Sequence, residues 1–169
     1  MHKAVFLDRD GIINIDKSYL FKREDFEFCD GIFEVLLHLQ RLGYLLIIVT
    51  NQSGIARGYY TEEEFLSLTH WMVTLLKQKG IVITEVFYCP HHPNAQCECR
   101  KPKAQMLLKA LEKYTIDPKY SWMIGDKESD IEAGRNANIV NTIFVNHARC
   151  EKALYSVQSI LDTIKIIKI

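Results

Sequence analysis

Short apolar segments alternate with segments in which apolar residues recur at helical spacing along most of the chain. The apolar segments predict strands at residues 3–7, 44–50, 82–88, 121–124 and 142–145. Helical spacing predicts helices between these strands, and a final amphipathic helix before the lysine-punctuated tail. Strands that alternate with helices are typical of a parallel sheet covered by helices. We therefore expect a doubly wound α/β fold with a mostly parallel sheet.

Residues at the helix ends support these predictions. Gly43 is a plausible stop for the first helix, and Thr61 is a strong start for the second, because its hydroxyl can cap the first turn. Three glutamates follow Thr61 and suit the positive end of that helix. A further short helix is expected near Ile131. The residues expected to face the core from the other successive helices are Ile32, Leu36 and Leu39, then Phe65, Leu68, Met72 and Leu75, and then Met106, Leu107, Ala110, Leu111 and Tyr114.

Length and composition indicate a single globular domain over residues 1–169, since the chain has room for one core and is 48% hydrophobic and 25% charged. Its 21 basic residues balance 21 acidic ones, so no net field draws it to nucleic acid or to a membrane surface. The longest wholly apolar run, residues 44–49, is far shorter than the roughly twenty residues of a spanning helix. The first apolar stretch stops at Asp8, too early for a signal peptide, so we expect a cytoplasmic monomer.

Polar residues follow three of the predicted strands where each strand ends. These residues are Asp8, Thr50 and Asp126. Because the carboxyl ends of strands border the ligand crevice of an open α/β sheet, we expect these side chains to converge. Asp126 is then a candidate metal ligand, together with Asp130. For Asp130 the alternative is that it serves only the macrodipole of the helix that it begins.

The segment Asp8-Arg-Asp10-Gly could carry phosphoryl chemistry. Two carboxylates at alternate positions could hold Mg²⁺, while one attacks phosphorus and the other handles a proton. A solvated turn is the alternative. Hydroxyl and amide donors at residues 50–53 could hold phosphoryl oxygens, and an Asx-type turn is the alternative for Asn51 or Ser53 taken singly.

Three of the five cysteines lie in one loop, residues 89–99, with two histidines. An odd count and this crowding argue against a disulfide framework and for a metal site in a reducing compartment. Three sulfurs and one nitrogen would complete a tetrahedral zinc site with no position left for water, which indicates a structural site. Free, reduced cysteines are the alternative. Cys29 and Cys150 are expected only to fill core or surface space.

Two cations, Arg100 and Lys101, follow this loop directly, and Pro102 would direct them toward the start of the next helix. Cations beside a helix start suit a phosphate group. In order along the chain, an acid, a hydroxyl, a cation and a second acid now stand at successive strand or helix ends. This pattern resembles the haloacid dehalogenase superfamily of phosphatases, and the resemblance covers nearly the whole chain.

The resemblance implies roles for individual residues. It makes Asp8 the nucleophile and Asp10 the acid/base, with Thr50 and Lys101 steadying the transferring phosphoryl group. It also implies Mg²⁺ held by Asp8, Asp10 and Asp126. Many members have threonine two residues after the second aspartate, where this chain has Ile12. This departure is expected to weaken a hydrogen bond within the nucleophile loop.

The Cys/His pairs followed by Arg-Lys-Pro are similar to the branch that contains the heptose-bisphosphate and histidinol-phosphate phosphatases. Segments 6–11, 50–58, 89–93 and 125–127 look most like the heptose enzymes. The likeness selects His91 to join Cys89, Cys97 and Cys99 on zinc. The substrate contacts that it implies are Asp16, Lys17, Ser18, Tyr19, Asn51, Gln52, Ser53, Arg100 and Lys127.

The activity implied is removal of the 7-phosphate of a heptose 1,7-bisphosphate, a small phosphorylated sugar, on the route to activated heptose for surface polysaccharide. The short segment between His92 and Cys97, as in the histidinol-phosphate relatives, makes histidinol-phosphate hydrolysis the nearest alternative. A non-catalytic, zinc-stabilised phosphoacceptor or binding module is disfavoured, because an acceptor needs no second acid. Between Thr50 and Lys101 there is room for one helix, one strand and the zinc loop, so we expect no full cap domain.

Overall fold

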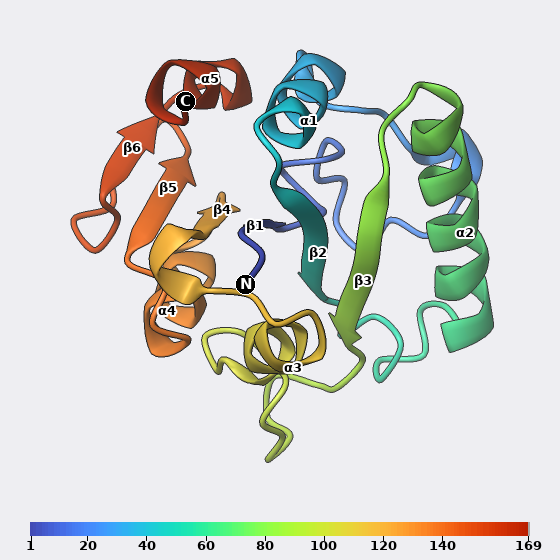
Figure 1. Ribbon diagram of the computed structural model, residues 1–169. Coiled ribbons are helices and arrows are strands. Elements are labelled where there is room, and N and C mark those ends of the chain that lie inside the picture. Colours follow the sequence, from blue (N-terminus) through green and yellow to red (C-terminus); the bar gives the residue numbers. More distant parts are fainter. Residues whose placement is uncertain (169) are drawn as a thin grey trace.

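The computed structural model describes residues 1–168, which form a six-stranded sheet with helices on both faces (Figure 1). The strands are β1 (Ala4–Leu7), β2 (Leu45–Asn51), β3 (Ile83–Cys89), β4 (Trp122–Gly125), β5 (Asn141–Val145) and β6 (Tyr155–Val157). The helices are α1 (Ile32–Arg41), α2 (Glu62–Gln78), α3 (Gln105–Lys113), α4 (Glu128–Asn136) and α5 (Thr163–Ile166). All neighbouring strands pair in parallel, in the order β3-β2-β1-β4-β5-β6. This order confirms the predicted doubly wound sheet.

Alternate side chains of each central strand enter two separate cores. In β1, Val5 and Leu7 pack with residues of α1 and α2, whereas Ala4 and Phe6 pack with residues of α3. The strands at the centre of the sheet are therefore apolar on both faces, as a parallel sheet between two helical layers requires. This double burial explains why the strands were visible in the sequence as continuous apolar runs.

The start of α2 forms as predicted. The Thr61 hydroxyl accepts a hydrogen bond from the Glu64 amide at 3.1 Å, and the Glu64 carboxylate accepts one from the Thr61 amide at 2.8 Å. This reciprocal pair satisfies two amide groups that would otherwise have no partner at the helix end. The predicted inward face of α2 is correct at Phe65, Leu68 and Met72, but it is Leu76 rather than Leu75 that is fully buried.

The end of the chain differs from the prediction. A strand, β6, pairs with β5 at the edge of the sheet, and only the four-residue helix α5 follows in place of a full amphipathic helix. Residues 155–157 are exposed or half-buried, and a strand of three residues is too short for an alternating pattern to be recognised in the sequence. Their strand conformation comes from pairing with β5.

Between β2 and α3 the described residues form α2, β3 and the loop after β3, without a cap domain, as expected. No helix among residues 1–168 is long and apolar enough to cross a membrane. That residues 1–169 form one domain stays a prediction. The carboxyl ends of β1, β2 and β4 meet at one edge of the sheet, where the polar loops gather.

The core packing on α2 predicts a difference between two leucines of the same helix. Leu76→Ala should lower the free energy of unfolding by about 2–5 kcal/mol, because it leaves a cavity at a fully buried site. Leu66→Ala, at a position that is 47% exposed, should change it by less than about 0.5 kcal/mol. Urea denaturation of both variants measures this difference, and equal losses would contradict the packing described.

Candidate active site

Carboxylates from two strand ends and one helix lie together at the carboxyl edge of the sheet. Asp8 follows β1, Asp126 follows β4, and Asp130 lies in the first turn of α4. One oxygen of each carboxylate lies within 4.8 Å of the others. Thr50 lies near the end of the neighbouring strand β2 and is linked to Asp10 through Gln52, whose Nε2 donates to both side chains. The predicted convergence of these strand ends is confirmed.

A glycine permits this close approach. Gly11 has a φ of +91°, and a Cβ atom at this position would lie 2.1 Å from Asp126 Oδ2. Any side chain at position 11 would therefore be both strained in its backbone and in collision with the carboxylate. The glycine of the Asp-Arg-Asp-Gly segment is thus required by the geometry of the carboxylate group.

Lys101 supplies the cation of this group. Its ammonium donates to Asp8 Oδ1 at 2.8 Å and to the carbonyl oxygen of Val49 at 2.7 Å, and it lies 2.6 Å from Asp130 Oδ1. All three charged side chains are almost fully buried. Asp130 therefore does more than complement a helix macrodipole. The sequence identified it as a candidate metal ligand or a helix-end acid, and nothing local indicated a pairing with Lys101.

The electrostatics of the group favour a further cation. Burial raises the pKa of Asp8 to about 8; the Asp130 carboxylate adds to this effect and Lys101 opposes it. Burial also raises the pKa of Asp126 to about 6. Asp126 Oδ1 is buried and has no hydrogen-bond partner. Three carboxylates share a single buried ammonium, because Lys127, the other cation near Asp126, is largely exposed. Oxygen donors of this kind fit a hard cation such as Mg²⁺.

Asp10 lies beside this group but is held separately. Its Oδ1 accepts from Arg9 Nη2 at 2.9 Å and from Asn14 Nδ2 at 3.0 Å, and its Oδ2 accepts from Gln52 Nε2 at 3.2 Å. Ile12 is fully buried, and the carboxylate has three donors without a hydroxyl at that position. The Asp10 side chain is not among the clustered carboxylates, so its direct contact with Mg²⁺ stays a prediction.

A cleft of about 390 Å³ opens above these residues. Eight of the nine predicted substrate contacts line it: Asp16, Ser18, Tyr19, Asn51, Gln52, Ser53, Arg100 and Lys127. Lys17 is not part of the lining and instead pairs with Glu27 at 3.3 Å on the surface. Tyr60 and Ser129 also line the cleft and were not predicted. Tyr60 follows the 50–58 segment, so its position next to that motif was the one available signal.

The cleft rim is cationic. Arg100 is half-buried, its Nη1 is buried without a hydrogen-bond partner, and burial lowers its pKa. The Lys127 ammonium nitrogen lies 3.4 Å from Asp16 Oδ2. Burial acts to lower the pKa of Lys127, but the nearby Asp126 and Asp8 carboxylates outweigh it and raise that pKa above its ordinary value. A guanidinium with an unused donor at the edge of a polar cleft is suited to an anionic group of a ligand.

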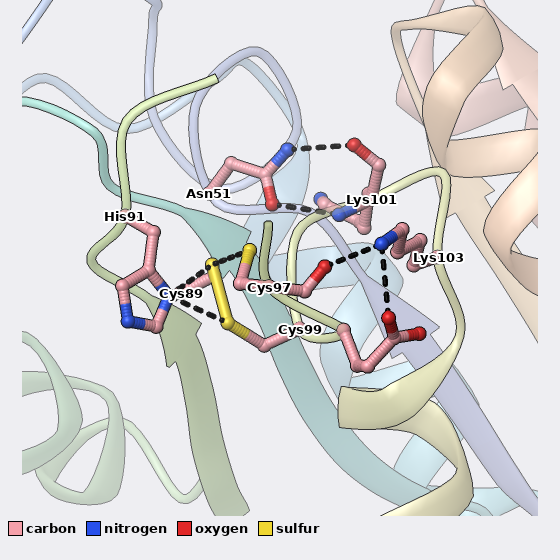
Figure 2. Close-up of a disulfide and its surroundings, with 8 residues drawn as sticks. Asn51, Cys89, His91, Cys97, Cys99, Lys101 and Lys103 are labelled. Carbon is pink, nitrogen blue, oxygen red and sulfur yellow. Dashed lines mark hydrogen bonds and ion pairs between the residues drawn. A yellow bond between two sulfur atoms is a disulfide. The ribbon is translucent and has the colours of Figure 1, made fainter. Parts of the chain in front are cut away.

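The loop after β3 brings together the four predicted zinc ligands (Figure 2). Ligand atoms of Cys89, His91, Cys97 and Cys99 all lie within 4.8 Å of one another. The structure places a disulfide between Cys89 and Cys99, with His91 Nδ1 at 3.4 and 3.1 Å from their sulfurs. His92 points elsewhere and accepts a hydrogen bond from the Asn94 amide. The predicted grouping is confirmed, whereas the expectation that no disulfide forms here differs from the structure.

Known proteins match this chain along its length. Residues 98–160 match the family model described as HAD-hydrolase-like. The chain is 46% identical over 180 residues to the D-glycero-beta-D-manno-heptose-1,7-bisphosphate 7-phosphatase of Pasteurella multocida, covering 99% of this chain and 98% of the relative. It is 54% identical over 149 residues to the D-glycero-alpha-D-manno-heptose-1,7-bisphosphate 7-phosphatase of Campylobacter jejuni, covering 88% of this chain and 86% of the relative.

A solved structure shares the fold at similar coverage. The crystal structure of D,D-heptose 1,7-bisphosphate phosphatase from B. bronchiseptica, complexed with magnesium and phosphate, has a TM-score of 0.86 to this chain at 26% identity. The match covers 97% of both chains.

The raised carboxylate pKa values predict how metal-free protein responds to pH. Because Asp8 and Asp126 hold protons more strongly in the folded state, stability should fall as pH rises from about 4 toward about 8. Mg²⁺ bound to these carboxylates should raise Tm. Asp126→Asn should remove the loss of stability near pH 6 and should also abolish this Mg²⁺-dependent rise in Tm. Thermal unfolding across this range, with and without Mg²⁺, tests both. The control Asp162→Asn, which loses only a surface pair with Lys165, should behave as wild type. A full Mg²⁺ response in Asp126→Asn would contradict this assignment.

Proposed function

Because this chain belongs to the heptose-1,7-bisphosphate 7-phosphatase family of haloacid dehalogenase-like hydrolases, we propose that it removes the 7-phosphate of a D-glycero-D-manno-heptose 1,7-bisphosphate. It is a phosphoric monoester hydrolase. The observation that carries the proposal is the position of the buried Asp8–Lys101 pair, next to a cleft with a cationic rim. That the enzyme acts as a cytoplasmic monomer stays a prediction.

The reaction proceeds in two phosphoryl transfers. An Asp8 oxygen attacks phosphorus and forms an aspartyl-phosphate as the bond from phosphorus to the sugar oxygen breaks, and Asp10 gives that oxygen a proton. Water then attacks the phosphorus of the aspartyl-phosphate and gives a proton to Asp10. The bond from phosphorus to the Asp8 oxygen breaks, so that phosphate is released and Asp8 is restored. The Lys101 ammonium, 2.8 Å from Asp8, offsets negative charge on the transferring group. The Thr50 hydroxyl accepts from Gln52 Nε2 at 2.9 Å, so its own proton is available to a phosphoryl oxygen.

Asp8 and Asp126 would hold Mg²⁺, since both oxygens of Asp130 already have partners, the Lys101 ammonium and the Lys127 amide, whereas Lys101 contacts only Oδ1 of Asp8. The ion would neutralise charge that otherwise keeps a carboxylate and a phosphate dianion apart. The unpartnered Asp126 Oδ1 supports this choice of ligands. A carboxylate that is buried without a donor is unfavourable unless a cation is bound.

The rim supports a bisphosphate over histidinol phosphate. A second phosphate needs cations or amide donors, whereas the ammonium and imidazole of histidinol phosphate need acidic partners. Arg100 and Lys127 line the cleft, and Arg57 lies close to Arg100 and over the Tyr19 ring. Two acidic residues line the cleft: Asp16 is next to Lys127, and Asp10 is held by Arg9, Asn14 and Gln52.

We also propose that the loop of residues 89–99 binds one structural zinc ion through Cys89, His91, Cys97 and Cys99. A disulfide would use two of these four groups and would leave the convergence of His91 and Cys97 unexplained. Three sulfurs and one nitrogen fill a tetrahedral site, so no position remains for a reacting water. The zinc would hold the segment from which Arg100 and Lys101 extend.

A substrate panel tests the activity. The kcat/KM for both anomers of the heptose bisphosphate should exceed that for histidinol phosphate, and Asp8→Asn should release no phosphate. Arg100→Ala should lose about 10- to 100-fold on the bisphosphate, the range for a charge-assisted hydrogen bond, and much less on a small monophosphate ester. The control Arg135→Ala, whose side chain bonds only to the main chain of Lys152, should keep full activity. Equal efficiency on histidinol phosphate would move the assignment to that activity.

The metal loop gives a separate test by thiol counting. If zinc is bound, protein purified without chelator or reductant should contain one zinc per chain and, once denatured, titrate as all five thiols of the sequence. Cys97→Ser should lose zinc and lower Tm, whereas Cys150→Ser, which lies in a separate apolar cluster with Ile131 and Phe144, should keep zinc. A wild-type protein with no zinc and only three free thiols would assign the loop to the Cys89–Cys99 disulfide.

A further inference from the structure

The Asn14 side chain is fully buried against Asp10. Its amide nitrogen donates to Asp10 Oδ1 at 3.0 Å and to the carbonyl oxygen of Ile15 at 3.1 Å. An ionised carboxylate and a carbonyl oxygen only accept hydrogen bonds, so the nitrogen, and not the oxygen, of the amide must face them. Both protons of the Asn14 amide are thereby used, and one of them is committed to Asp10.

Half of the Asn14 amide gains nothing from its burial. Asn14 Oδ1 is buried and has no hydrogen-bond partner. The preceding residues, Ile12 and Ile13, are fully buried aliphatics, and an aliphatic side chain at position 14 would remove this unpaired Oδ1 at the expense of the donors to Asp10 Oδ1 and the Ile15 carbonyl. The shape of the loop is set by main-chain bonds, from the Gly11 amide to the Asn14 carbonyl at 2.7 Å and from the Asn14 amide to the Arg9 carbonyl at 3.2 Å. These bonds do not involve the Asn14 side chain.

The donors around Asp10 are unequally divided between its two oxygens. A carboxylate oxygen has two acceptor positions. Oδ1 accepts from Asn14 and from Arg9 Nη2, at 2.9 Å, and both donors come from buried side chains. Oδ2 accepts only from Gln52 Nε2, at 3.2 Å. The single acceptor position that remains on Asp10 is therefore on Oδ2.

The Gln52 amide cannot turn to change this arrangement. Its Oε1 accepts from the Tyr60 hydroxyl at 2.5 Å, and its nitrogen also donates to the Thr50 hydroxyl. Asp10 lines the cleft and keeps 17% of its side chain exposed. The carboxylate is thus fixed on its buried side and open toward the cleft through one oxygen.

We infer that Asn14 is a positioning residue: together with Arg9 it saturates Oδ1 of Asp10, so that the proton of the reaction is exchanged at Oδ2. This inference rests on the proposed function, in which Asp10 is the acid/base. The proton leaves Oδ2 as the bond from phosphorus to the sugar oxygen breaks. It returns to Oδ2 from the water that attacks the aspartyl-phosphate. Oδ1 keeps its two hydrogen bonds in both steps.

Leaving groups of different basicity separate positioning from a structural role. A sugar alkoxide needs a proton as it leaves, whereas p-nitrophenolate leaves without one. Asn14→Leu and Asn14→Ala should slow single-turnover release of the sugar product by about 10- to 100-fold, at the lower end of the range for general acid catalysis. In the same single-turnover format, release of p-nitrophenolate from p-nitrophenyl phosphate should change by less than about threefold, and half-saturation by either substrate should stay close to wild type, since Asn14 does not line the cleft.

Asn141→Leu is the matched control. The Asn141 amide donates to the carbonyl oxygens of Lys119 and Ser121 at the amino end of β5, away from the cleft. Its loss should lower Tm and leave the ratio of the two rates unchanged. This ratio does not depend on the fraction of folded enzyme, so it is comparable between variants of different stability.

Asp10→Asn separates failure of this inference from failure of the proposed function. If Asp10→Asn slows both substrates equally, the acid role of Asp10 is wrong, and the inference falls with it. If Asp10→Asn selectively slows the sugar substrate and neither Asn14 variant does, the role of Asn14 alone is overturned. Failure of both Asn14 variants to fold would also overturn it, because the amide would then be a structural requirement.

Discussion

The contact of the buried Lys101 ammonium with Asp8 and Asp130 is the interaction on which the site depends. Asp8 follows β1, Asp130 lies in the first turn of α4, and Lys101 lies in the loop before α3, so this contact joins three separate parts of the chain. Removal of one partner from a buried ion pair typically costs about 3–5 kcal/mol, because the remaining charge is left without compensation. The three groups therefore hold the edge of the sheet in the arrangement that catalysis uses.

Lys101 reaches this position because the loop before it is fixed at two points. The Asn51 amide donates to the Lys101 carbonyl at 3.2 Å and its oxygen accepts from the Lys101 amide at 3.0 Å, which ties the loop to the end of β2 (Figure 2). Cys89 ties it to the end of β3 through the cluster with Cys97 and Cys99. A loop that is remote from the reacting atoms thus sets the position of the cation next to the nucleophile.

The charges of the cleft are arranged in two layers. Carboxylates predominate near the sheet, where Asp8, Asp126 and Asp130 lie within reach of one cation, and cations predominate at the rim. This separation suits a phosphate ester, whose reacting phosphorus must approach a carboxylate while its other anionic group requires a positive partner. It also gives the two carboxylates of the Asp-Arg-Asp segment different environments. Asp8 is paired with an ammonium, and Asp10 is held by amide and guanidinium donors.

The sequence by itself determined those features that are encoded locally. Apolar runs and caps involve neighbouring residues, so the sequence predicted five of the six strands and the start of α2. For the same reason it predicted the strand-end positions of Asp8 and Thr50 and, from ligand spacing, the grouping of Cys89 with Cys97 and Cys99. Only the tertiary structure decided β6, the position of Lys17 outside the cleft and the pairing of Lys101 with Asp130. The same is true of the contact between Asn14 and Asp10. The physical reason is that an edge strand depends on the strand that it pairs with. Likewise, a polar side chain in a loop shows in sequence only what it could bind, whereas its actual partner depends on which elements the fold places beside it.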